Sequence, residues 1–122
     1  MHQSRDQPGY SISCTIVRWA GLDSPPGIVA VEVLDVRGGA HRYLVKFYDV
    51  SEAELDEKSS YPRPGFIVCR LVQTETDADG HLFAFVDIDA MPLKGTDSNI
   101  KVPMDRLLPI RPWQSWQIGR LK

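Results

Sequence analysis

The fold is decided by the stretch IVAVEVLDVRGGAHRYLVKFY, residues 28–48, together with a second stretch, residues 66–89. In each stretch two apolar runs flank a short turn sequence that glycine can close. The turn sequences are Arg37-Gly38-Gly39-Ala40 and Asp77-Ala78-Asp79-Gly80. Such an arrangement is the strongest short-range indication of a β-hairpin. The sequence therefore predicts two hairpins, Ile28–Tyr48 and Phe66–Asp89, which the rest of the chain covers.

The turn lengths predict a register for each hairpin. In the first hairpin a two-residue glycine turn places Asp35 opposite Arg42, and opposite charges across a ladder favour that pairing. In the second hairpin a four-residue loop pairs Thr76 with His81 and places Arg70 opposite Asp87. On one face of the second hairpin, about half of the apolar side chains are aromatic. We expect a helix, the C-terminal tail or another subunit to cover this face.

Two further elements are predicted around the hairpins. Residues 11–19 alternate between apolar and polar side chains, which is typical of a half-buried strand. Between the hairpins, Asp49–Lys58 changes to a helical pattern. Ser51 and Glu54 have the spacing of a capping box, and Val50 and Leu55 have that of a hydrophobic staple. The sequence therefore predicts a short helix at this position.

The predicted fold class is α+β, organised as one domain over residues 1–122. We expect a curled antiparallel sheet or small β-barrel of five to six strands, with one short helix between the two hairpins. Residues 1–9 are predicted to be a loose N-terminus, because they are polar and contain a Pro-Gly pair. Residues 109–122 are predicted to be a basic, tryptophan-containing tail.

Composition places the chain among ordinary soluble globular proteins. It has 122 residues, of which 43% are hydrophobic and 25% are charged, with a formal net charge of −2. No apolar run approaches the roughly 20 residues that span a bilayer, and the N-terminus lacks the apolar segment of a secretory signal. We therefore expect a cytoplasmic protein that has no contact with membranes.

No catalytic, metal-binding or cofactor-binding motif is evident, so we expect neither a metal nor a cofactor. Cys14 and Cys69 do not form a C-x-x-C pair and are interpreted as buried reduced thiols. Asp77 and Asp79 have the spacing of a calcium loop, but Val86 stands where such a loop needs a bidentate glutamate. We therefore interpret Asp77–Gly80 as an ordinary turn.

The acidic and basic residues are unevenly distributed along the chain. Residues 49–57 and 75–89 each carry five acidic residues and no lysine or arginine, whereas bases outnumber acids from Lys101 onward. Acidic clusters are suited to a basic partner, and a tail rich in Arg and Trp has the composition of binding hot spots. The predicted partner-binding residues are Glu52, Glu54, Asp77, Asp79, Arg111, Trp113 and Trp116. Alternatively, the two tryptophans form a lid over the aromatic face, in the same chain or, by swapping, in a homodimer.

Three functions follow as hypotheses. The leading one is a small non-enzymatic interaction protein that binds a protein partner, of the adaptor, accessory or toxin-neutralising type. The second is a small-molecule-binding protein or enzyme with a pocket inside the curled sheet, lined by Glu32, Tyr43, Phe47 and Phe85. The third is a nucleic-acid binder that works through the basic Trp tail, which the acidic net charge disfavours.

Overall fold

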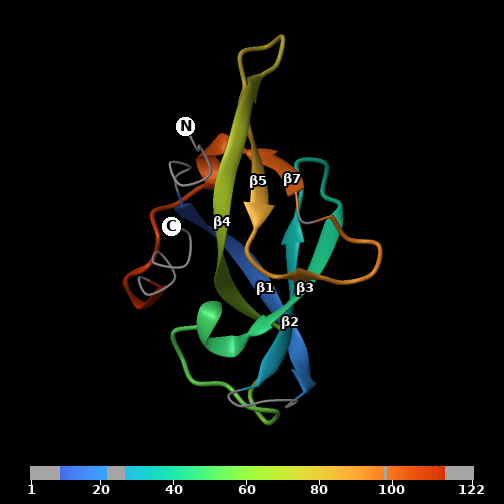
Figure 1. Ribbon diagram of the computed structural model, residues 1–122, viewed down its shortest axis with the longest axis vertical. Coiled ribbons are helices and arrows are strands. Elements are labelled where there is room, and N and C mark those ends of the chain that lie inside the picture. The colour runs from blue at the N-terminus through green and yellow to red at the C-terminus, as the bar shows by residue number, and fades with distance from the viewer. Residues whose placement is uncertain (1–8, 22–26, 98, 115–122) are drawn as a thin grey trace, which may run out of the picture.

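The computed structural model describes residues 9–21, 27–97 and 99–114 (Figure 1). These residues form one seven-stranded antiparallel sheet in the order β6-β3-β2-β1-β4-β5-β7. The strands are β1 (Gly9–Gly21), β2 (Ile28–Leu34), β3 (Ala40–Lys46), β4 (Arg63–Thr76), β5 (Leu82–Ile88), β6 (Met91–Pro92) and β7 (Asn99–Pro103). Short 3-10 turns follow β3 at Phe47–Asp49 (η2) and β7 at Met104–Arg106 (η3). No helix in this part of the chain is long and apolar enough to cross a membrane.

The sheet curls into a half-barrel around the long strand β1. The first half of β1 pairs with β4, from Gly9 opposite Arg70 to Ile16 opposite Arg63. Its second half pairs with β2, with register shifts that bend the strand. The backbone N–H of Val36, in the β2–β3 turn, donates to the carbonyl of Lys101 in β7 at 2.8 Å. The two hairpins therefore approach each other on the side away from β1.

The hydrophobic core lies inside this curl, because alternate side chains of each strand point inward. Its fully buried side chains include Ile12, Ile16, Val29, Val31, Tyr43, Ile67, Val86 and Val102. The strand predicted at residues 11–19 is present in β1, with the expected face buried. The loose N-terminus predicted at residues 1–9 lies outside the described residues except for Gly9, which begins β1.

The first hairpin forms, but the predicted register is wrong. Arg42 lies opposite Glu32 instead of Asp35, and the Arg42 Nε is 3.1 Å from Glu32 Oε2. Asp35 instead closes the turn. Its carboxylate accepts the backbone N–H groups of Arg37 and Gly39 at 2.8 and 2.9 Å, and lies 2.8 Å from His41 Nε2. These contacts end both strands before the turn, so the pairing shifts by three residues.

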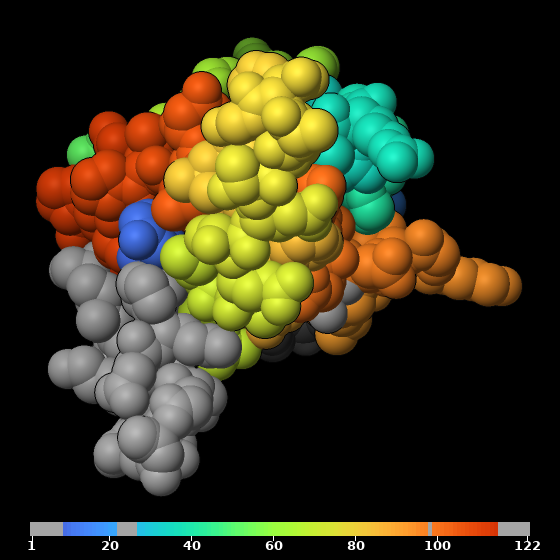
Figure 2. All heavy atoms as spheres, turned by 90° about the horizontal axis from the view of Figure 1, so that it is seen from above, coloured from blue at the N-terminus to red at the C-terminus, as the bar shows by residue number. Residues whose placement is uncertain are grey.

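The second hairpin forms with the predicted register at its base. Arg70 lies opposite Asp87, and their side chains form an ion pair of 2.8 Å. Beyond Leu71 a register shift displaces the pairing by one residue, so Thr76 lies opposite Leu82 and the predicted pairing with His81 is wrong. Figure 1 shows this hairpin as a long arm. Figure 2 looks down onto its tip, with the C-terminal segment packed on one side and the β2–β3 turn on the other.

The helix predicted at Asp49–Lys58 is absent, and the count of five to six strands is too low. The Val50 carbonyl, which a helix would use internally, accepts the backbone N–H of Phe66 at 3.0 Å. The Ser51 hydroxyl donates to the Ala53 carbonyl at 2.8 Å instead of capping a helix. Val50 and Leu55 are buried, so the staple residues pack on the core from an irregular segment. Tertiary contacts have overridden local helix propensity here.

Candidate functional site

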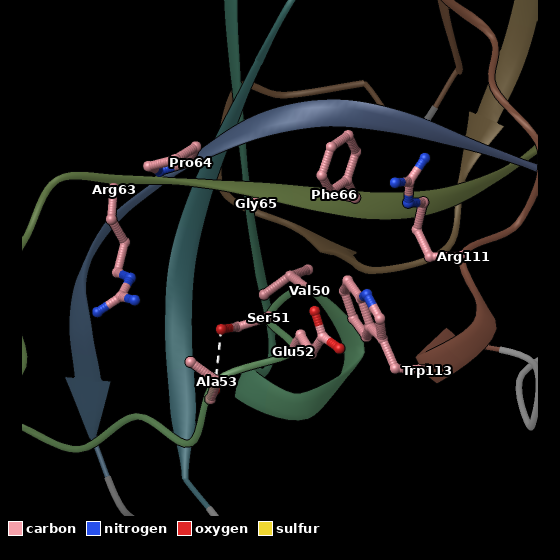
Figure 3. A pocket seen from close by; sticks show the side chains of 10 residues that line it. All are labelled: Val50, Ser51, Glu52, Ala53, Arg63, Pro64, Gly65, Phe66, Arg111 and Trp113. Carbon is pink, nitrogen blue, oxygen red and sulfur yellow. Dashed lines mark hydrogen bonds between the residues drawn. The ribbon is translucent and has the colours of Figure 1, made fainter.

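A groove of about 510 Å³ lies where β4, the segment after η2 and the C-terminal segment meet (Figure 3). We call it the arginine–tryptophan groove. It is lined by Val50, Ser51, Glu52, Ala53, Arg63, Pro64, Gly65, Phe66, Arg111 and Trp113. Three segments that are far apart in the sequence therefore contribute to one concave surface.

Gln114 holds the C-terminal wall of the groove in place. Its side chain is 0% exposed and makes four hydrogen bonds. Its Oε1 accepts the Ser11 hydroxyl at 3.0 Å and the Arg111 backbone N–H at 3.2 Å. Its Nε2 donates to the carbonyls of Asp49 at 3.1 Å and Phe66 at 3.2 Å. One side chain thus joins β1, η2, β4 and the C-terminal segment.

An isolated antiparallel β-bridge supports the same wall. Ser11 and Leu108 exchange two backbone hydrogen bonds, each of 2.8 Å. The C-terminal segment is therefore paired with β1 before it reaches Arg111 and Trp113. Because Gln114 follows directly, the chain is held on both sides of these two groove residues.

The floor of the groove requires a glycine. A Cβ atom added at Gly65 would lie 2.7 Å from the Val50 carbonyl oxygen and 2.8 Å from Ile16 Cδ1. Both distances are shorter than van der Waals contact. Gly65 therefore allows the segment after η2 to lie directly against β4, with its exposed residues Glu52 and Ala53 on the opposite side of the groove from Phe66.

The groove contains two arginines that have no acidic partner within ion-pair distance in the described part of the chain. Arg63 and Arg111 are both partly buried, yet among the described residues neither guanidinium has a carboxylate within ion-pair distance. The Arg111 guanidinium instead lies over the Phe66 ring, with Cζ 4.8 Å from the ring centroid. By contrast, the partly buried Arg70 is paired with Asp87 at 2.8 Å. Two partly buried guanidinium groups and two aromatic rings thus line one groove.

The four residues predicted to line a ligand pocket do not converge. Tyr43 and Phe47 point into the core, and the Tyr43 hydroxyl donates to the Asp97 carbonyl at 2.7 Å. Glu32 and Phe85 lie on the outer face, where Glu32 pairs with Arg42. The three-residue register shift of the first hairpin explains why Glu32 and Tyr43 lie on opposite faces, because an odd shift moves a side chain to the other face of the sheet.

The predicted partner-binding residues are divided between two places. Glu52, Arg111 and Trp113 meet in the groove, whereas Glu54 is exposed outside its lining and Trp116 lies outside the described residues. Asp77 and Asp79 lie at the exposed tip of the β4–β5 hairpin (Figure 1). The sequence analysis missed Arg63, Phe66 and Gln114 as contributors to the site. Arg63 and Phe66 flank a Pro-Gly pair between the predicted helix and the second hairpin, and nothing in the sequence marks Gln114.

The acidic tip forms a hydrogen-bonded turn. Asp77, Asp79 and His81 bring their ligand atoms within 4.8 Å of one another. However, the Asp77 carboxylate accepts the backbone N–H groups of Asp79 and His81, both at 2.9 Å. These backbone hydrogen bonds, the one from His81 first, lower the pKa of Asp77. The carboxylate therefore organises the turn of the hairpin.

Both cysteines are buried free thiols. Burial raises the pKa of each to about 12, so both remain protonated at neutral pH. Cys14 lies opposite Gly65 and Cys69 lies opposite Tyr10, four residues apart along the β1–β4 ladder. They serve as small core residues and take no part in the groove.

Comparison with known proteins adds no further information. No protein-family model matches the chain, and neither a curated protein nor a solved structure matches it significantly.

Proposed function

We propose that this protein is a non-enzymatic binding protein that holds a protein partner in the arginine–tryptophan groove. The observation that carries the proposal is the pair of partly buried guanidinium groups, Arg63 and Arg111, without a carboxylate within ion-pair distance among the described residues. Charged groups that are removed from water are normally paired. An incoming partner would supply the missing counter-charges.

The other lining residues support the same function. Trp and Arg are the residues most enriched in interface hot spots, and Phe66 and Trp113 add aromatic surface beside the guanidinium groups. Glu52 and Ala53 on one wall and Pro64 on the other are exposed, so the groove is open to solvent. Small-molecule sites enclose most of their ligand, whereas an open groove suits a chain segment that lies across it.

Site-specific photocrosslinking tests the proposal. A benzophenone amino acid at position 53, in the groove, is compared with the same group at position 40. Ala40 is also exposed, but it lies at the start of β3 and outside the groove lining. In extracts of the source organism we expect a discrete protein adduct from position 53 only, and loss of that adduct when Arg63 and Arg111 are changed to Ala. Equal adducts from both positions, or no effect of the arginines, would refute a groove interface.

A further inference from the structure

The positions of the two guanidinium groups indicate what a partner must present, provided that the proposed function is correct. Arg63 and Phe66 are three residues apart on β4, which corresponds to about 10 Å along a strand. Arg111 lies over the Phe66 ring. Figure 3 shows the two arginines at opposite ends of the groove, with Val50, Glu52 and Trp113 between them. The groove is therefore positive at both ends, with the apolar surfaces of Val50 and Trp113 and the carboxylate of Glu52 between them.

We infer that the partner contributes an extended segment with two acidic side chains four residues apart and an apolar side chain midway between them, all on one side of the segment. Each carboxylate would accept charge-assisted hydrogen bonds from one guanidinium group. The apolar side chain would lie between Phe66 and Trp113. Alternate side chains of an extended chain point to the same side, so both carboxylates and the apolar side chain can face the groove.

Glu52 restricts where the acidic residues can lie. Its carboxylate is on the opposite wall, between the two arginines and beside Trp113 (Figure 3). An acidic side chain at the middle of the segment would meet this negative charge, whereas a backbone N–H group would donate to it. Glu52 thus favours segments with acidic residues at both ends over uniformly acidic segments.

The same charges favour a peptide over a nucleic acid. Phosphate groups would also pair with arginine, and bases would stack on tryptophan. However, Glu52 is followed by Glu54, Asp56 and Glu57, all of which are exposed. A continuous row of phosphates would meet this acidic segment, and the net charge of −2 opposes binding further. A peptide segment with only two carboxylates avoids both costs.

Selection from a random twelve-residue peptide library displayed on phage tests this inference. Wild-type protein is the bait, and the Arg63→Glu/Arg111→Glu variant removes peptides that bind elsewhere. The matched control is Arg18→Glu/Arg37→Glu, which makes the same change of charge at two exposed arginines outside the groove lining. We expect enriched peptides to carry two Asp or Glu residues separated by three positions. Synthetic versions should bind wild type and control alike, and the groove variant at least about tenfold more weakly.

The outcomes separate failure of the inference from failure of the proposed function. Groove-dependent peptides without paired acidic residues would overturn the inference and leave the groove function intact. If no enriched peptide depended on the two arginines, both would be wrong. Groove-dependent binding of a labelled 20-nucleotide single strand, with no paired acids among the peptides, would replace the peptide by a nucleic acid.

Two controls keep these results interpretable. Thermal unfolding followed by circular dichroism shows whether the double-glutamate variant is folded, and Arg63→Gln/Arg111→Gln replaces it if it is not. Sedimentation of the wild type alone tests whether the occupant is a second copy of this chain. Self-association that the groove variant abolishes would show that it is, and would overturn the inference of a separate acidic partner.

Discussion

Replacing Gln114 with Ala should destabilise the protein far more than is usual for a residue near the C-terminal end of a chain. The four hydrogen bonds of this buried side chain connect the C-terminal segment with β1, η2 and β4. The variant removes all four hydrogen bonds. The partner groups, which include the Ser11 hydroxyl and the Phe66 carbonyl, therefore lose their hydrogen bond to residue 114. It also leaves a cavity where the buried side chain was.

The expected magnitude follows from these contacts. A typical intramolecular hydrogen bond contributes about 1 kcal/mol net, which gives about 4 kcal/mol for four bonds. Two of the four, those to Arg111 and Phe66, are only partly buried, so water can replace part of the loss. We therefore expect the free energy of unfolding to fall by about 3 kcal/mol.

Urea unfolding followed by tryptophan fluorescence measures this change, with Gln73→Ala on the exposed part of β4 as the control. Gln114→Leu adds a second comparison, because it fills most of the cavity but restores no hydrogen bond. It should remain close to the alanine variant. A loss below about 1 kcal/mol for Gln114→Ala would refute the view that this side chain holds the groove wall in place.

Three further predictions concern the floor of the groove, the first turn and the thiols. Gly65→Ala should reduce the free energy of unfolding, measured in urea, by about 1–3 kcal/mol, because the added methyl group collides with the Val50 carbonyl. A change below about 0.5 kcal/mol would contradict the close approach of Val50 to Gly65. The hydrogen bond from His41 and those from the turn backbone lower the pKa of Asp35 below its usual 3.8, so its stabilising effect is present above that value and is lost as the pH falls through the lower folded-state pKa. Unfolding measured from pH 5 to pH 2 should therefore weaken more in wild type than in Asp35→Asn, and equal slopes would exclude this role. Burial raises the pKa of both cysteines to about 12, so a thiol reagent at pH 8 should react slowly with the native protein and rapidly in urea; fast native reaction would show that the thiols are accessible.

The register of the first hairpin could not be predicted from local sequence patterns. The sequence indicates two strands and a glycine-containing turn, and both are present. It also contains two acidic residues, Glu32 and Asp35, either of which can lie opposite Arg42. The register depends on where Asp35 stabilises the protein more. It can form a cross-strand ion pair, or it can accept hydrogen bonds in the turn from two backbone N–H groups and His41. Several hydrogen bonds outweigh one exposed ion pair.

The helix predicted at Asp49–Lys58 failed for a related reason. Its capping box and staple are real features of the sequence, and each favours a helix by about 1 kcal/mol. The structure instead uses the Val50 carbonyl to pair with Phe66 and the Asp49 carbonyl to bind Gln114. These partners lie 16 and 65 residues away in the sequence. Local patterns carry no information about such contacts.

By itself, the sequence determined the two hairpins, the strand at residues 11–19 and the Arg70–Asp87 pairing. These depend on alternation and on turn residues, which act over a few positions. Only the tertiary structure decided the groove. The groove brings together Arg63, Arg111 and Trp113. It forms because the C-terminal segment pairs with β1 and because the Gln114 side chain makes hydrogen bonds to three distant backbone and side-chain groups. Contacts over such separations depend on how the whole sheet curls, and no local pattern encodes that.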